Sequence, residues 1–412
     1  MSLNRRDFAA LAGAAAFSLP LFARARGESR MPQKPEDIVP FRIAISDAQI
    51  ADLKERLAMA RWPAAVARDW SHGQPVAFVR ELADQWLKDY DWRRHEAELN
   101  AYPQFTTIID GQTIHFLHVR SPEPGAFPLI LSHGWPSTIA EFLDVIGPLS
   151  NPRKYGRDPA MAFDLVIPSL PGYGWSTPLT GSDWDAIHTA RAWDVLMKRL
   201  GYTRYGAQGG DGGALIGREL GILAPEGLVG THLQQIFAFP SGAPGEMERV
   251  TPFEKAGFAN LSHFQKYSGY ADIQSKRPAT LAFGLVDSPV AQLAWNAELF
   301  VGFEGEYARS ADRDRFLTHV SIYWFTASGG SAGEFYMANA ASNGGYREEP
   351  AGTVPTAVAV FPDDFRSVRA FAERSTKNIV QWTEMPRGGH FAASGEPDLL
   401  VEDITRFFAG LR

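Results

Sequence analysis

The segment Gly209-Gly210-Asp211-Gly212-Gly213 has the composition of a sharp turn with one reactive side chain at its apex. It follows an apolar run that predicts a strand and precedes a pattern that predicts a helix over about 213–223. A turn of this kind needs small residues around its apex and projects the apex side chain above the sheet. The Gly212 N–H then lies at a helix N-terminus, where developing negative charge is stabilised. We therefore predict that Asp211 is a nucleophile and that Gly212 contributes to an oxyanion hole.

Three further segments carry the groups that such a nucleophile needs. His133-Gly134-Trp135-Pro136 ends an earlier predicted strand and offers the Trp135 N–H as a second oxyanion donor. Gly388-Gly389-His390 follows the last predicted strand, and Phe361-Pro362-Asp363-Asp364 ends an earlier one. The chain order of nucleophile, acid and histidine is that of α/β-hydrolases. The predicted triad is Asp211, Asp364 and His390, with Asp363 as the alternative acid.

An aspartate nucleophile indicates attack on a saturated carbon and formation of an ester intermediate. His390 would then activate the water that hydrolyses the ester. The substrate class is an epoxide or an alkyl halide. Epoxide opening releases an alkoxide that needs an acid such as tyrosine, whereas a halide needs N–H donors, and the neighbour of the nucleophile here is only Gly212. Haloalkane dehalogenation on the same triad and a non-catalytic protein that binds an apolar ligand remain alternatives.

Short apolar runs alternate with helical patterns through much of the chain. This alternation favours a mostly parallel sheet with helices on both faces. The predicted strands are 127–132, 162–168, 204–208, 357–361 and 378–382.

Three other regions frame this sheet. Residues from about 33 to 100 show helical periodicity, and residues from about 240 to 346 form a helical, aromatic block that we interpret as a lid. Residues 105–119 predict a hairpin around an Asp-Gly turn. His115 and His118 lie on opposite faces of its second strand, so no metal site is expected there.

The N-terminus resembles a twin-arginine export signal. Arg5 and Arg6 precede an apolar run of about 15 residues, shorter than the roughly 20 that span a bilayer. Ala23-Arg24-Ala25 is a plausible cleavage site. We predict a signal peptide at 1–27, export to the periplasm, and no stable membrane anchor in the mature chain.

The composition excludes several function classes. The 412 residues carry a formal charge of −7, so the chain lacks the basic excess typical of nucleic-acid binding. There is no cysteine, which excludes disulfides, cysteine-ligated metals and a thiol nucleophile. The glycine-rich turn fits neither nucleotide-binding pattern. We expect no cofactor, no metal and no nucleic-acid partner, and the sequence leaves a homo-oligomer open.

Taken together, the motifs resemble those of the microsomal-type epoxide hydrolase family of α/β-hydrolases. The likeness runs from about Val39 to the end of the chain. The motifs that carry it are Ile38-Val-Pro-Phe41, Arg61-Trp-Pro63, Tyr90-Asp-Trp-Arg93, Glu98-Leu-Asn100, Phe105-Thr-Thr-Ile108, His133-Gly-Trp-Pro136, Pro168-Ser-Leu-Pro-Gly-Tyr-Gly174, Gly209-Gly-Asp-Gly212, Asp287-Ser-Pro289 and Gly388-Gly-His-Phe-Ala-Ala393.

The resemblance implies a small apolar epoxide as substrate and two lid tyrosines that hydrogen-bond its oxygen. Their positions match Tyr270 and Tyr336, with Tyr267 and Tyr323 as neighbouring candidates. It also selects Asp364 as the acid. The fold implied is an α/β-hydrolase fold with a mostly parallel central sheet, a helical lid inserted in the core and a helical N-terminal extension. The predicted units are 1–27 (signal), 28–104 (N-terminal region), 105–239 (first half of the core), 240–346 (lid) and 347–412 (second half of the core).

The sequence departs from the family pattern in three places. Gly212 stands where the family usually has an aromatic residue, which removes a pocket wall while keeping the backbone donor. The membrane-bound members have an N-terminal anchor where this chain has a predicted export signal. The segment 327–336 is unusually rich in glycine, which weakens the assignment of Tyr336.

Overall fold

A nine-stranded sheet crosses the described part of the chain, which comprises residues 34, 36–64, 68–307, 312–344, 347 and 349–412 of a computed structural model. The strand order is β1-β2-β3-β5-β4-β6-β7-β8-β9. Pairs up to β3·β5 are antiparallel and the later ones are parallel. The strands are β1 (Val39–Phe41), β2 (Gln104–Ile109), β3 (Gln112–Val119), β4 (Phe127–Ser132), β5 (Phe163–Pro168), β6 (Tyr205–Gly209), β7 (Leu228–Leu233), β8 (Thr356–Val360) and β9 (Ile379–Glu384). The predicted signal at 1–27 lies outside the described residues.

The five predicted buried strands are β4, β5, β6, β8 and β9, each with ends within two residues of the prediction. The predicted hairpin is β2–β3, and its turn has positive φ at Asp110 and Gly111, as a two-residue hairpin turn requires. Strands β1 and β7 were not predicted. β1 has only three residues, and Gly230 and His232 interrupt the apolar pattern of β7.

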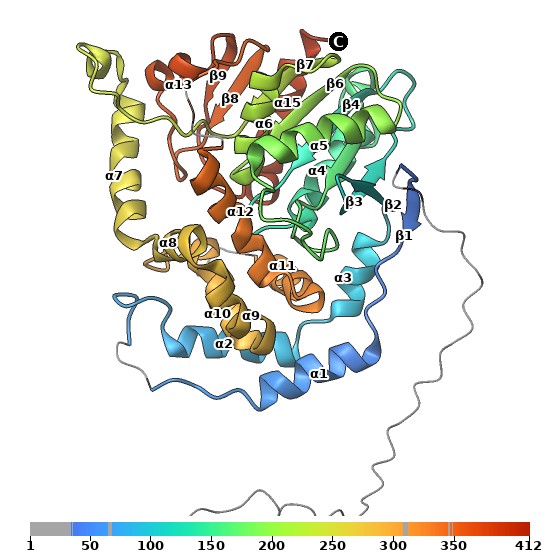
Figure 1. Cartoon of the computed structure of the whole chain (residues 1–412), viewed down its shortest axis with the longest axis vertical. Coiled ribbons are helices and arrows are strands. Elements are labelled where there is room, and N and C mark those ends of the chain that lie inside the picture. Colours follow the sequence, from blue (N-terminus) through green and yellow to red (C-terminus); the bar gives the residue numbers. More distant parts are fainter. Residues whose placement is uncertain (1–33, 35, 65–67, 308–311, 345–346, 348) are drawn as a thin grey trace, which may run out of the picture. The chain divides into compact units, whose positions relative to one another are not determined.

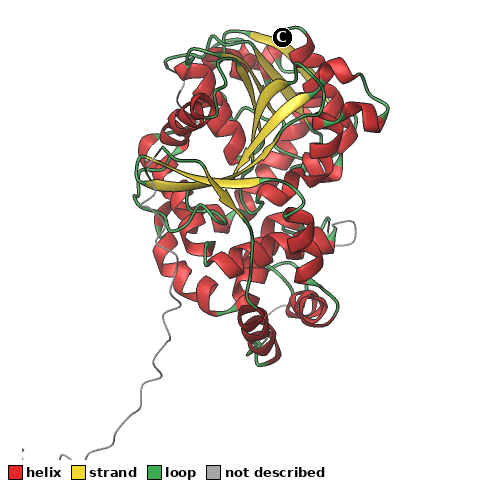
Figure 2. Ribbon diagram, turned by 90° about the vertical axis from the view of Figure 1, so that its right-hand side faces the viewer, coloured by secondary structure: helices red, strands yellow, loops and turns green. Residues whose placement is uncertain are grey.

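Helices cover both faces of the sheet (Figure 2). Alternating side chains of the central strands pack into two hydrophobic clusters, one on each face. Leu129 and Leu131 of β4 belong to the cluster that includes α4 and α15, whereas Ile130 belongs to the cluster that includes α5 and α6. This alternation is the period of a strand, and burial on both faces explains its continuous apolar run. The helices are α4 (Leu143–Ser150), α5 (Ala186–Arg199), α6 (Gly212–Leu223), α13 (Arg369–Ser375), α14 (Ala392–Gly395) and α15 (Pro397–Ala409).

The predicted lid segment supplies six α-helices among its described residues, and the N-terminal region supplies three. The lid helices are α7 (Pro252–Tyr267), α8 (Gly269–Lys276), α9 (Pro278–Asp287), α10 (Pro289–Phe300), α11 (Arg313–Thr326) and α12 (Gly329–Ser342). The N-terminal helices are α1 (Asp47–Ala58), α2 (Val76–Lys88) and α3 (Trp92–Leu99). As Figure 1 shows, α1 and α2 lie beside α10, while α3 contacts α11. Trp86 Nε1 donates to Ser321 Oγ at 2.9 Å and so ties α2 to α11.

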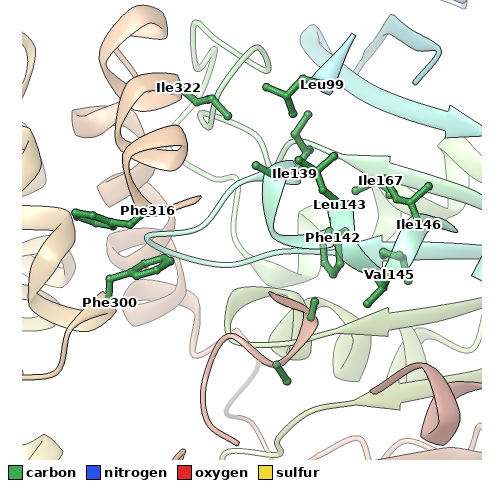
Figure 3. Packing of buried hydrophobic residues seen from close by; sticks show 14 of the residues in the cluster. Leu99, Ile139, Phe142, Leu143, Val145, Ile146, Ile167, Phe300, Phe316 and Ile322 are labelled. Atoms are coloured by element: carbon green, nitrogen blue, oxygen red, sulfur yellow. The ribbon is translucent and has the colours of Figure 1, made fainter. Parts of the chain in front are cut away.

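A single hydrophobic cluster joins the sheet, the lid and the N-terminal region (Figure 3). Phe300 of α10 and Phe316 of α11 pack with ring centroids 4.9 Å apart. Ile139 and Phe142 of the short 3₁₀ helix η1 (Ile139–Phe142) belong to the same cluster and are buried. This packing holds the loop after β4, which approaches the predicted nucleophile. Among the described residues, no helix is long and apolar enough to cross a bilayer.

Candidate active site

Asp211 occupies the apex of the turn between β6 and α6. Its backbone has φ of 51° and ψ of −123°, a conformation that costs a non-glycine residue about 1–3 kcal/mol. The neighbouring glycines make the turn sterically feasible. A Cβ on Gly209 would lie 2.2 Å from the Gly213 oxygen, and a Cβ on Gly213 would lie 1.9 Å from the Ser132 oxygen. The glycines therefore allow the close approach that lifts the Asp211 side chain from the strand end.

The loop after β4 brings the predicted oxyanion donor to this carboxylate. The Trp135 N–H donates to Asp211 Oδ1 at 2.9 Å. A Cβ on Gly134 would lie only 2.1 Å from the same oxygen, so this position accepts only glycine without movement of the loop or the carboxylate. Oδ1 is thus directed into the predicted oxyanion hole, and Oδ2 is left facing His390.

His390 lies between the two predicted carboxylates. Its Nε2 is 3.3 Å from Asp211 Oδ2, and its Nδ1 is 2.9 Å from Asp364 Oδ1. These residues come from loops after β6, β8 and β9, whose carboxyl ends meet at one edge of the parallel sheet. The structure therefore brings the predicted triad together at this edge.

Asp211 and His390 carry opposite charges in this site. Burial opposes ionisation of Asp211, but contact with His390 and the backbone N–H groups of Trp135 and Gly212 outweigh it, so the pKa of Asp211 is lowered. Burial also opposes the charged form of His390, yet Asp364 and Asp211 together raise the pKa of His390 well above its usual value. The resting pair is thus a carboxylate and an imidazolium.

The structure distinguishes the two adjacent aspartates. Asp364 bonds to the imidazole, whereas the exposed Asp363 uses its backbone N–H to bond to the Gly388 carbonyl at 3.0 Å. Gln234 was not predicted, yet its side-chain amide donates to the His390 carbonyl at 2.6 Å and so supports the histidine loop. Gln234 follows β7, the strand that was not predicted, so its place at the same sheet edge was not recognised.

Both predicted lid tyrosines lie beside Trp135. The ring of Tyr270, from α8, stacks on the indole of Trp135 with centroids 4.7 Å apart and an interplanar angle of 18°. The ring of Tyr336, from α12, lies edge-on at 6.2 Å from Trp135 and 6.1 Å from Tyr270. Both tyrosine rings thus contact the residue whose backbone N–H bonds to Asp211.

The two neighbouring candidates have other partners. The hydroxyl of Tyr323 donates to the Ser137 carbonyl at 3.0 Å. The hydroxyl of Tyr267 donates to Glu304 Oε1 at 2.9 Å in an exposed position. Tyr323 therefore supports the loop after β4, and Tyr267 lies on the lid surface.

The departure at Gly212 has a structural counterpart in the lid. A Cβ on Gly212 would lie 3.1 Å from Cε1 of Phe335, a buried residue of α12. A lid side chain thus occupies the direction in which a side chain at 212 would project. Phe335 thus supplies an aromatic surface beside Gly212 from another element, and the loss of a pocket wall at Gly212 stays a prediction.

This fold and this edge of the sheet define the class of the protein as an α/β-hydrolase. Residues 128–252 match the family model described as alpha/beta hydrolase fold, and residues 38–142 match the model described as epoxide hydrolase N terminus.

Several relatives are similar along nearly the whole chain. A Stigmatella aurantiaca protein inferred to be an epoxide hydrolase is 40% identical over 91% of this chain and 86% of its own length. Epoxide hydrolase 1 of Oryctolagus cuniculus is 32% identical over 95% of this chain and 93% of its own length. The structure of the Aspergillus niger epoxide hydrolase is 31% identical, with a TM-score of 0.80 over 91% of this chain and 97% of that chain. This chain belongs to the microsomal-type epoxide hydrolase family.

Proposed function

We propose that this protein hydrolyses an apolar epoxide to a vicinal diol through an ester on Asp211. The observation that carries the proposal is the placement of Asp211 between the Trp135 N–H, at 2.9 Å from Oδ1, and the His390 imidazole, at 3.3 Å from Oδ2. Its membership of the epoxide hydrolase family supports the same reaction.

In the first half-reaction, Asp211 attacks an epoxide carbon. Oδ1 is held by the backbone, so Oδ2 is the oxygen that forms the new bond to carbon. The epoxide C–O bond breaks, and its electron pair leaves on oxygen as an alkoxide. A hydroxyl of Tyr270 or Tyr336 gives its proton to that alkoxide, which is the role of a general acid. The products are a hydroxyalkyl ester and a tyrosinate.

In the second half-reaction, His390 acts as a base. Esterification removes the Asp211 charge that holds the proton on His390, so the imidazole can return that proton to the tyrosinate. His390 then takes a proton from water, whose oxygen attacks Cγ of Asp211. Charge develops on Oδ1 against the N–H groups of Trp135 and Gly212, while Asp364 stabilises the imidazolium. Collapse breaks the Cγ–Oδ2 ester bond, and the leaving alkoxide takes the proton from the His390 imidazolium to give the diol. The carboxylic acid left on Asp211 then passes its proton to His390, which restores the carboxylate and the imidazolium.

Aromatic side chains support an apolar substrate. Trp135, Tyr270, Phe335 and Tyr336 belong to, or pack against, one hydrophobic cluster around the nucleophile. Aromatic walls with a few directed polar groups are typical of sites for apolar small molecules.

Two variants test the covalent mechanism. Asp211→Ala should form no ester, whereas His390→Gln should accumulate the ester on Asp211 because it retains the nucleophile but lacks the base. Intact-protein mass spectrometry after mixing with styrene oxide measures the adduct. Full turnover without an adduct in His390→Gln would contradict the mechanism. Halide release from bromoalkanes, without diol from epoxides, would instead indicate dehalogenation.

We also propose that residues 1–27 direct export by the twin-arginine route. The support is the Arg5-Arg6 pair, the short apolar run after it and the Ala23-Arg24-Ala25 site. Fusion of residues 1–30 to a reporter that needs export in the folded state should deliver the reporter to the periplasm. Replacement of both arginines by lysine should block delivery, and delivery that persists would contradict the proposal.

A further inference from the structure

The peptide unit between Gly134 and Trp135 is bonded at both of its ends. Its N–H, on Trp135, donates to Asp211 Oδ1 at 2.9 Å. Its carbonyl, on Gly134, accepts from His133 Nδ1 at 2.9 Å and lies 3.3 Å from Ser137 Oγ. Because the peptide is planar, groups that fix the carbonyl also fix the direction of the N–H. Donors to the carbonyl also polarise the amide and strengthen its N–H as a donor.

His133 is a constant donor to this carbonyl. Its Nε2 accepts the Leu170 N–H at 3.2 Å, which leaves the proton of the neutral ring on Nδ1, facing Gly134. Burial lowers the pKa of His133 to about 4, so the ring stays neutral in the range where the enzyme would work.

Ser137 has one hydroxyl proton and two neighbouring acceptors. Its Oγ contacts the Gly134 carbonyl on one side and Glu141 Oε2 on the other. If Glu141 is ionised, the serine proton goes to the carboxylate and the Gly134 carbonyl loses this donor. If Glu141 is protonated, the carboxylic acid donates to Oγ and the serine donates to Gly134. Both side chains are buried, and Ile139 and Phe142 anchor the intervening turn in the hydrophobic core (Figure 3).

We propose that Ser137 and Glu141 are positioning residues for the oxyanion hole and that the proton on Glu141 decides whether Ser137 holds the Gly134–Trp135 peptide. The complete chain runs from the Glu141 carboxylic acid through the Ser137 hydroxyl and the peptide to Asp211 Oδ1. This inference rests on the proposed function, since it concerns the oxygen on which charge develops during ester hydrolysis.

Glu141 gains or loses its proton near neutral pH, so the pH decides which acceptor the Ser137 hydroxyl uses. Burial raises the pKa of Glu141 to about 7. The titratable groups that act on Glu141 come from four other places in the fold: Asp211 in the turn after β6, Asp364 after β8, His390 after β9 and Tyr323 of α11. The His390 imidazolium lowers the pKa of Glu141 more than the Asp211 carboxylate raises it, so the loss of both charges in the ester raises that pKa and favours protonated Glu141 near neutral pH.

Glu141→Gln tests whether the proton on Glu141 directs the Ser137 hydroxyl, because the amide donates to Ser137 at every pH. Single-turnover reactions with styrene oxide, followed by intact-protein mass, separate ester formation from ester hydrolysis. The ratio of the hydrolysis rate constant in Glu141→Gln to that in the wild type should rise several-fold between pH 5.5 and 8.5. Ester formation should change by less than about threefold. Ser137→Ala should slow hydrolysis by about tenfold, less than the 10²–10³-fold typical of removing an oxyanion donor.

A double variant distinguishes the serine route from a direct charge effect. In the Ser137→Ala background, Glu141→Gln should leave the pH dependence of hydrolysis unchanged. Glu254→Gln is the matched control, because Glu254 is a buried carboxyl that caps α7, and its ratio to the wild type should be flat with pH. The inference would be overturned if the ratio of hydrolysis rate constants for Glu141→Gln did not change with pH. It would also be overturned if Glu141→Gln still changed the pH dependence of hydrolysis in the Ser137→Ala background. Absence of any ester in the wild type would instead overturn the proposed function.

Discussion

The two halves of the candidate site are held in different ways. On the sheet edge, Asp211, His390 and Asp364 are fixed by polar contacts of 2.9–3.3 Å and by glycines that admit no side chain. On the lid, the rings of Tyr270 and Tyr336 contact Trp135 and each other with centroids 4.7–6.2 Å apart. Nucleophilic attack depends on the geometry of a single carboxylate, whereas two tyrosines can share the role of the acid. We therefore expect substitutions on the sheet edge to abolish chemistry and substitutions on the lid to modulate it.

The largest contrast should lie between two adjacent carboxylates. Asp364→Asn should slow ester hydrolysis by about 10³–10⁴-fold, because an amide no longer orients His390 or stabilises the imidazolium. Asp363→Asn is the control, since its side chain is exposed, and it should retain activity within about twofold. Steady-state diol formation measures both variants. Equal losses would mean that the acid has been assigned to the wrong residue.

Close approach of the loop after β4 should matter almost as much. Gly134→Ala would place a methyl group 2.1 Å from Asp211 Oδ1, and we expect kcat/KM to fall by about 10²–10³-fold as the oxyanion donor moves away. Gly284→Ala is a suitable control, because a Cβ there meets nothing within 4 Å in a lid helix. It should leave activity unchanged and raise the free energy of unfolding by up to about 1 kcal/mol. Near-normal activity of Gly134→Ala would show that the loop or the Asp211 carboxylate can move without loss of function.

Loss of one lid hydroxyl should be milder. Tyr270→Phe or Tyr336→Phe should slow ester formation by about tenfold, since the other tyrosine can still act as the acid, and the double variant should lose much more. Rapid-quench measurement of the ester separates this effect from hydrolysis. Tyr267→Phe provides the control, because its hydroxyl bonds to Glu304 on the lid surface. If the losses in the rate of ester formation were additive in the double variant, the two tyrosines would have separate roles and would not share the role of the acid.

The smallest expected effect is a change in how the rate of ester formation depends on pH. Contact with His390 helps to keep the pKa of Asp211 below its usual value, so wild-type ester formation should show no loss from this group above about pH 5. In His390→Gln, burial is opposed only by backbone donors, and the pKa of Asp211 should rise. Adduct formation in that variant should therefore fall several-fold as pH is lowered from 7 to 5. A pH-independent rate in His390→Gln would show that the backbone alone keeps Asp211 ionised.

Sequence reasoning recovered the parts of the site that depend on local pattern. Strand ends, glycine spacing and chain order located Asp211, Trp135 and His390, because a sharp turn between a strand and a helix leaves a local signature. Adjacent aspartates carry no such signature: the family resemblance selects Asp364, and the hydrogen bond to His390 distinguishes it from Asp363. Partners that meet through tertiary packing were missed for the same reason.

Phe335 and Gln234 illustrate this limit. Phe335 reaches Gly212 from a lid helix that lies more than a hundred residues later in the chain, so no local pattern connects them. Gln234 follows β7, where His232 faces a buried partner, Asp403 of α15, at 2.9 Å. That buried polar pair removes the apolar run by which a central strand is usually recognised.

The bond between Trp86 and Ser321 spans 235 positions of the chain, and Tyr90 meets Thr318 across 228. Helix α2 and the turn after it are made early in synthesis, but the buried indole of Trp86 and phenol of Tyr90 reach these partners only after most of the chain has been synthesised. Loop closure over such a distance is slow compared with local helix formation. The N-terminal helices therefore cannot complete their packing until the lid helices have been synthesised. A chain truncated before Ser321 would lack the α11 partners of Trp86 and Tyr90.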